Sequence, residues 1–188
     1  HQDGSFKEQW FIPQLYIGFK KQISVYSNFL LVNDEKFRGV WHKNVRRGYV
    51  EINSNTTKII SGGFFLEMGR FIARDTNIVG NGHKFGVWTT FKPASQLVIE
   101  NNYNYFKLSS LRGEKKLSLQ YILRNKTAYQ FSKNLFLRLL TQYDSEDKIF
   151  HIDPLLSYKL NPFTIFYIGS THDISDYGSS TTRDRFIE

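Results

Sequence analysis

The sequence of 188 residues contains no cysteine, which excludes disulfides and thiol chemistry. No run of about 18 apolar residues is present, so a membrane-spanning helix of ordinary length is excluded as well. No stretch shows the apolar spacing of an amphipathic helix of about 10 to 12 residues. A transmembrane β-barrel is compatible with all three absences, because its lipid-facing residues alternate with polar ones.

The net charge is +8, but the basic residues form no dense block. Pairs such as Lys20-Lys21 and Arg46-Arg47 are separated by long neutral stretches. This scatter argues against a nucleic-acid surface and predicts no nucleic-acid partner. The charges suit solvated turns and strand ends, or contacts with anionic lipid head groups.

Apolar and polar residues alternate with a period of two along most of the chain, which predicts antiparallel strands. We expect about ten of them. The segments are 15–19, 23–31, 36–53, 60–68, 85–91, 97–105, 117–123, 135–143, 149–160 and 165–169.

The predicted connections alternate in length. Short turns are expected at 20–22, 54–56, 93–94, 132–133 and 161–162. Longer links are expected at 70–84, where Gly80-Asn81-Gly82 is interpreted as a turn with positive φ, and at 109–115 and 144–148. Bacterial outer-membrane barrels place short turns at one end and longer loops at the other.

Two architectures explain this pattern. In a soluble lipocalin-like barrel the apolar faces point inward, and in a membrane barrel they point outward. Most segments reach the roughly 9–11 residues of a tilted membrane strand and exceed the 5–6 that are usual in globular proteins. Tyr103, Tyr105, Tyr143 and Tyr158 lie towards strand ends, as in an interfacial girdle. We therefore predict an all-β, antiparallel, up-and-down transmembrane β-barrel.

The phase of the alternation assigns residues to two faces. The predicted lipid-facing residues are Leu135, Leu137, Leu139, Leu156, Tyr158, Leu160, Ile165 and Tyr167. The predicted lumen-lining residues are Glu100, Arg124, Lys126, Arg138, Gln142 and Lys159, with Ser157, Thr164 and Phe166 beside them. These charges either fill the lumen with salt bridges or form a lining selective for anions or sugars.

The last third of the chain carries specific motifs. They are Tyr129-Gln130-Phe131-Ser132, Leu135 to Arg138, Gln142-Tyr143, Leu155-Leu156, Tyr158, Asn161-Pro162, Thr164, Phe166 and Gly169. In these the chain resembles the C-terminal barrel domain, of unknown function, that follows a carbohydrate-binding domain similar to family nine in outer-membrane proteins of Bacteroidota. Phe163 departs from the pattern, since the family often has glycine there.

The resemblance implies a protein of the outer membrane of a Gram-negative bacterium. Its function would be that of a pore, a component for glycan uptake or binding, or a membrane scaffold. Expected partners are lipid and lipopolysaccharide, glycans and other outer-membrane subunits. We expect residues 1–188 to be a single β-barrel domain or the C-terminal portion of one, with the last strand missing. The family's sugar-binding domain is not expected in this chain.

Catalytic motifs are few. No two histidines have zinc-ligand spacing, and no nucleophile elbow or P-loop occurs, so no metal or cofactor is predicted, and a passive role is favoured over an enzyme without excluding one. The candidates for an alternative, an outer-membrane hydrolase with a site at the rim, are His172, Asp173 and His83. Asp75 and Asn77, with His83, form a weak candidate for calcium binding.

Overall fold

The computed structural model describes residues 8–175 and 185–187 and contains antiparallel β-structure throughout. The strands are β1 (Glu8–Phe11), β2 (Gln14–Phe19), β3 (Ile23–Leu30), β4 (Val32–Phe37), β5 (Val40–His42), β6 (Arg47–Ser54), β7 (Ile60–Ala73), β8 (Ile78–Ala94), β9 (Leu97–Ser110), β10 (Lys116–Gln130), β11 (Leu135–Asp144), β12 (Ile149–Asn161), β13 (Thr164–Ser175) and β14 (Arg185–Ile187). A 3-10 turn, η1 (Lys20–Gln22), joins β2 to β3.

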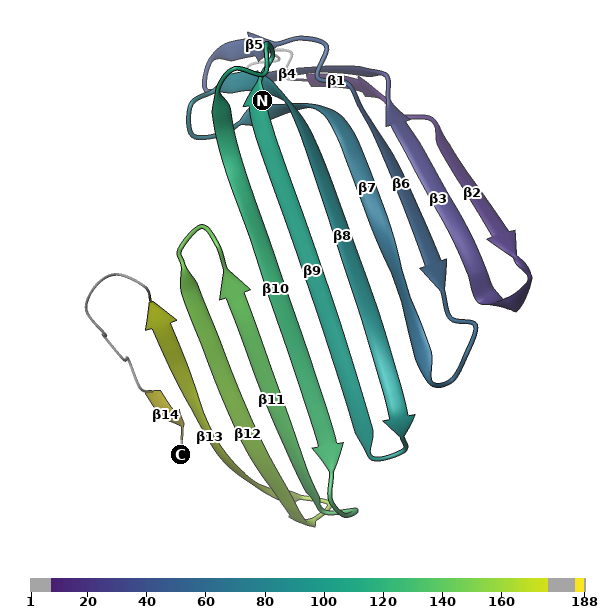
Figure 1. Cartoon of the computed structure of the whole chain (residues 1–188), viewed down its shortest axis with the longest axis vertical. Helices are drawn as coiled ribbons and strands as arrows, with labels where there is room; N and C mark the ends of the chain where they lie inside the picture. Colours follow the sequence, from purple (N-terminus) through teal and green to yellow (C-terminus); the bar gives the residue numbers. More distant parts are fainter. Residues whose placement is uncertain (1–7, 176–184, 188) are drawn as a thin grey trace. The chain divides into compact units, whose positions relative to one another are not determined.

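Eleven of the strands form one sheet, in the order β14-β13-β12-β11-β10-β9-β8-β7-β6-β3-β2. Most neighbours in this sheet follow one another in the sequence, as Figure 1 shows, so the predicted antiparallel, up-and-down β-structure is confirmed. Among the described residues, no pairing joins β2 to β14 and closes the sheet. The barrel itself therefore stays a prediction.

The central strands are long. β7 has 14 residues, β8 has 17 and β10 has 15. Globular strands average about 5–6 residues, and a tilted strand needs about 9–11 to cross a bilayer. Each of these strands is therefore long enough to cross the hydrocarbon core of a membrane and extend beyond it.

The chain divides into two compact units. The first comprises residues 1–54, 63–86 and 105–119, and the second comprises 55–62, 87–104 and 120–188. All four buried hydrophobic residues of the described chain, Leu30, Val45, Ala73 and Leu108, belong to the first unit. No described hydrophobic side chain of the second unit is buried to the same degree.

The predicted strand at 36–53 is wrong in its boundaries. Part of this segment belongs to a small separate sheet with the order β1-β4-β5, and part forms β6. The small sheet turns back at Arg38 and Gly39, which both have positive φ and separate the paired residues Phe37 and Val40. Two such residues between a pair are typical of a tight hairpin turn.

The expected long loop at 70–84 is also wrong, because β7 continues to Ala73 and β8 begins at Ile78. Gly80 and Gly82 lie inside β8, and neither has positive φ. Because they have no side chain, both glycines allow the backbone of β9 to approach β8 closely. A Cβ atom on Gly80 would lie 2.2 Å from the carbonyl oxygen of Ser109, a distance that no side chain tolerates.

The hairpin of β12 and β13 contains a register shift. Asn161 pairs with Thr164 across a two-residue turn, but Lys159 pairs with Ile165. A residue inserted into one strand reverses the side-chain phase of all the residues that follow. Ile165 and Tyr167 therefore share a face with Lys159 and Ser157, and their predicted grouping with Leu156 and Tyr158 is corrected.

Candidate functional site

Strands β10 to β13 of the second unit present two chemically different faces. Directly paired residues in antiparallel strands lie on the same face of a sheet. Leu137 pairs with Tyr129 and Leu156, and we call their side the apolar face. Arg138 pairs with Ala128 and Leu155, and we call their side the polar face.

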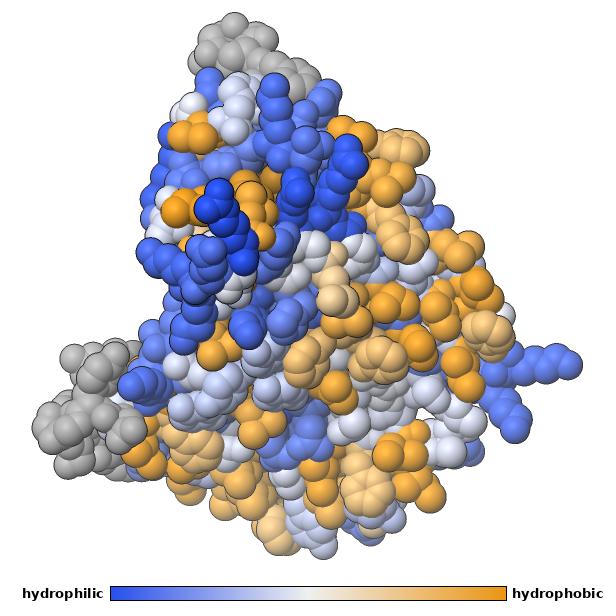
Figure 2. All heavy atoms as spheres, turned by 45° about the horizontal axis from the view of Figure 1, so that its top comes forward, coloured by the Kyte–Doolittle hydropathy of each residue, from blue (hydrophilic) through white to orange (hydrophobic). Residues whose placement is uncertain are grey.

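The apolar face is open to its surroundings. Leu123 is 51% exposed and Ile168 is 72% exposed, although both lie within strands. Six of the predicted lipid-facing residues share this face through the strand register: Leu135, Leu137, Leu139, Leu156, Tyr158 and Leu160. Figure 2 shows that apolar side chains also reach the molecular surface in broad patches. A monomeric soluble protein rarely exposes large apolar patches.

Aromatic residues border the apolar face at two levels. The first aromatic band consists of Tyr103, Tyr121, Tyr143 and Phe150. The ring centroids of Tyr103 and Tyr121 are 6.5 Å apart, those of Tyr121 and Tyr143 are 5.8 Å apart, and Phe150 pairs with Tyr143.

The second aromatic band consists of Tyr129, Tyr158 and Phe166. Tyr158 on β12 pairs with Phe166 on β13, and Tyr129 lies on β10, with β11 between it and β12. Leu123, Leu139 and Leu156 lie between the bands along their strands, and Asn125, Thr127 and Thr141 share this face with them. Aliphatic residues flanked by aromatic bands are typical of the outer surface of a membrane barrel.

The polar face brings all six predicted lumen residues together. Arg124 pairs with Gln142, and Lys126 donates a hydrogen bond of 2.8 Å to Glu100 on β9. Arg138 lies on the same face of β11 as Gln142, and Lys159 lies on the same face of β12 as Leu155. The alternation of the sequence predicted this grouping, and the register places it on one side of the sheet.

A hollow of about 360 Å³ lies on this polar face. It is lined by Trp88, Thr89, Thr90, Glu100, Asn101, Asn102, Arg124 and Lys126. On the polar face the lining combines a guanidinium, an ammonium, a carboxylate, the amide of Asn102 and the hydroxyl of Thr90 beside the Trp88 indole ring. The side chains of Thr89 and Asn101 are hydrogen-bonded to each other on the opposite face, where Asn125 also bonds Asn101. The sequence interpretation missed Trp88 because it assigned this strand from Phe85, Val87 and Phe91. Trp88 and Thr90 alternate with those residues and therefore lie on the other face of the sheet.

The predicted cluster of His172 and Asp173 is not assembled as a catalytic group. These two residues point to opposite faces, because Asp173 pairs with His151 and His172 pairs with Ile152. On the polar face, Nδ1 of His151 lies 2.5 Å from Oδ1 of Asp173. On the apolar face, Nε2 of His172 lies 2.9 Å from the hydroxyl oxygen of Ser170.

The calcium candidate is also dispersed. Asp75 and Asn77 lie in the turn between β7 and β8, whereas the ring of His83 stacks on Tyr105 at 5.7 Å. Asn77 has a φ of 57° and directs its side chain to His42 of the small sheet. These residues therefore support a structural contact and not an ion site.

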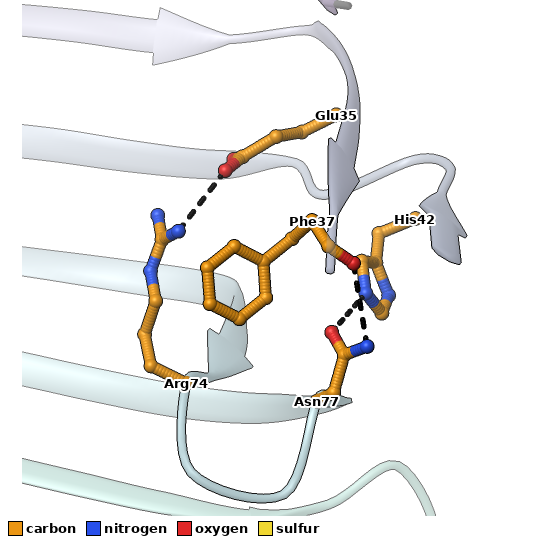
Figure 3. Close-up of polar contacts among 5 residues, drawn as sticks. All are labelled: Glu35, Phe37, His42, Arg74 and Asn77. Atoms are coloured by element: carbon orange, nitrogen blue, oxygen red, sulfur yellow. Dashed lines mark hydrogen bonds and ion pairs between the residues drawn. The ribbon is translucent and has the colours of Figure 1, made fainter. Parts of the chain in front are cut away.

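Figure 3 shows how this contact ties the small sheet to the β7–β8 turn. The ring of His42, only 6% exposed, donates through Nε2 to the Asn77 side-chain oxygen at 2.7 Å. The amide of Asn77 donates to the backbone oxygen of Phe37 at 3.3 Å. Arg74 lies over the Phe37 ring, 4.6 Å from its centroid, and forms an ion pair of 3.2 Å with Glu35.

Within the described ranges, no three or more histidine, aspartate or glutamate side chains gather as a metal site would require. No described helix has the length and apolar character needed to cross a membrane. Comparisons with protein-family models, curated proteins and solved structures find no match to this chain.

Proposed function

We propose that this chain forms part of the wall of a β-barrel in the outer membrane of a Gram-negative bacterium. In this proposal the apolar face contacts lipid and the polar face lines an aqueous lumen. The observation that carries it is a leucine-rich face, half-buried to exposed, which is bordered by two aromatic bands and lies opposite a charged face.

The spacing of the bands supports the proposal. Tyr121 and Tyr129 are eight positions apart on β10, and Phe150 and Tyr158 have the same spacing on β12. At a rise of about 3.3 Å per residue, eight positions extend about 26 Å along a strand. A strand tilt of about 40° reduces this to about 20 Å, close to the roughly 25 Å apolar band of outer-membrane barrels.

The distribution of burial supports it as well. A soluble domain excludes water from its apolar side chains by packing them against one another. In the second unit the described leucines and isoleucines are half-buried or exposed, and the one fully buried side chain is Ser157. Lipid would cover the surface that no protein layer covers.

A barrel of this kind conducts or takes up polar solutes through its lumen. The charged residues that line the lumen determine which solutes pass. The resemblance of the last third of the chain adds glycan uptake or binding, or a scaffold for a neighbouring module, to the proposal. Lipid, lipopolysaccharide, glycans and other outer-membrane subunits are the partners that fit it.

The test is the mobility of the native protein, extracted from outer membranes, in SDS gels with and without boiling. A closed barrel resists SDS until it is heated, because its hydrogen-bonded strands leave no free edge. We expect a heat-dependent shift and fractionation with outer membranes. A water-soluble, folded monomer without such a shift would replace the membrane barrel with a soluble ligand-binding barrel.

A hydrolase is the second candidate, favoured by the 2.9 Å contact between Ser170 and His172. This distance lies within the reach of a nucleophile and its base. Asp173 cannot complete a triad there, because it pairs with His151 on the other face. Hydrolysis of a lipid ester that both Ser170→Ala and His172→Ala abolish, with membrane assembly intact, would support it. Equal turnover in the wild type and both variants would exclude it.

A further inference from the structure

The cations of the polar face outnumber the carboxylates that could neutralise them. Arg124 and Arg138 are exposed and have no ion-pair partner among the residues that the structure describes. Lys92, in the phase of Trp88 and Thr90 on β8, and Lys159 on β12 likewise have none. These four side chains leave uncompensated positive charge.

The carboxylates of this face are already engaged or withdrawn. Glu100 accepts from Lys126 at 2.8 Å, and Asp173 accepts from His151 at 2.5 Å. Asp153 has its Oδ1 atom buried. Asp144, in the same phase at the end of β11, accepts from the backbone N–H of Glu146 at 2.8 Å and is the one carboxylate of this face, among the described residues of β9 to β13, with neither a basic partner nor a buried, unpaired oxygen.

The hollow beside Arg124 concentrates groups that bind anions. Its guanidinium presents a planar fork of donors that matches carboxylate and phosphate oxygens. The amide of Asn102 and the hydroxyl of Thr90 belong to the same lining, whereas the side chains of Thr89 and Asn101 bond to each other on the apolar face. Nearby Lys126 is held by Glu100, so Arg124 is the cation of the hollow that remains available.

We propose that the polar face of the second unit selects anions, with Arg124 and its hollow as the point where a small oxyanion binds. The ligand class is a phosphate-bearing or carboxylate-bearing solute. This inference rests on the proposed membrane barrel and names the kind of solute that its lumen admits.

The experiment measures the reversal potential of the native protein in planar bilayers, with about 1 M KCl against about 0.1 M. The Debye lengths at these concentrations are about 3 Å and 10 Å, so charges on distant loops contribute little. We expect a chloride-to-potassium permeability ratio above one and a decrease in conductance when inorganic phosphate is added.

Three variants locate the effect. The double variant Arg124→Gln and Arg138→Gln should move the permeability ratio towards one and weaken the phosphate block. Glu100→Gln frees Lys126 and should raise the ratio. Lys133→Gln removes the same charge from the β10–β11 turn and should leave the ratio near that of the wild type.

The outcomes separate the inference from the proposed function. Cation selectivity, or a ratio that the arginine variants do not change, overturns anion selection and leaves the membrane barrel in place. A heat-modifiable, membrane-inserted protein that conducts no ions does the same. A protein that remains in the soluble fraction overturns both. Gel mobility of each variant verifies that it has assembled.

Discussion

At the scale of single residues, neighbouring leucines on β11 have opposite surroundings. Leu139 pairs with Pro154 on the apolar face, midway between the levels of Tyr143 and Leu135. Leu140 pairs with Lys126 and Asp153 on the polar face. The two residues are adjacent in the sequence, but under the proposed function Leu139 contacts lipid and Leu140 faces the lumen.

This pair yields a matched prediction. Leu139→Arg would place a charge near the middle of the bilayer at a cost of about 2–4 kcal/mol. We therefore expect this variant to have a lower free energy of unfolding in membranes than the wild type. Leu140→Arg would place the same charge beside Asp153 in the lumen and should assemble normally. Urea titrations of folding into lipid vesicles measure both. Equal stability of the two variants would contradict the assignment of faces.

At the scale of elements, the small sheet depends on its link to the β7–β8 turn. Asn77 occupies a left-handed backbone conformation that glycine also adopts readily. Its side chain bonds both His42 and the backbone of Phe37. The link therefore rests on one amide group whose removal need not disturb the turn.

We predict that Asn77→Gly loosens the small sheet. The buried ring of His42 would lose its partner, which costs about 1–3 kcal/mol. Hydrogen exchange of the β4 and β5 amides should become faster, and exchange in β10 to β13 should not change. Asp75→Gly makes the same kind of substitution in the same turn and serves as the control. Faster exchange in both variants would mean that the turn backbone, and not the amide, provides the link.

The elements also show what the sequence could predict. A period of two follows directly from strand geometry, so most strands were predicted correctly. That Arg124, Lys126 and Arg138 line a lumen stays a prediction. The phase of β13 was not, because the shift between Lys159 and Asn161 depends on pairing across the hairpin. The small sheet was missed because β4 and β5 are short and polar. The Arg38-Gly39 pair, which forms the turn between β4 and β5, was the feature of the sequence that could have predicted this hairpin.

At the scale of the whole molecule, the proposal links band spacing to membrane thickness. A mismatch between an apolar surface and the bilayer costs fractions of a kcal/mol per Å. The bands of this chain match an apolar layer of about 20 Å, thinner than the roughly 30 Å of a typical bilayer. We therefore predict a higher folding yield in dilauroyl-phosphatidylcholine than in dioleoyl-phosphatidylcholine vesicles. The unboiled gel band measures this yield, and a higher yield in the thicker bilayer would contradict the prediction.

The register shift at the β12–β13 turn has a consequence for how such a chain can diverge. If the intact turn paired without the shift, Leu160 would face Ile165 and the two sides of β13 would exchange, so Ile165 and Tyr167 would trade places with Phe166 and Ile168. All four are large and apolar, so this end of the strand would tolerate the exchange. Farther along, the same exchange would move Asp173 to the apolar face. A substitution in this turn that removes the shift should therefore persist only with compensating substitutions near residue 173.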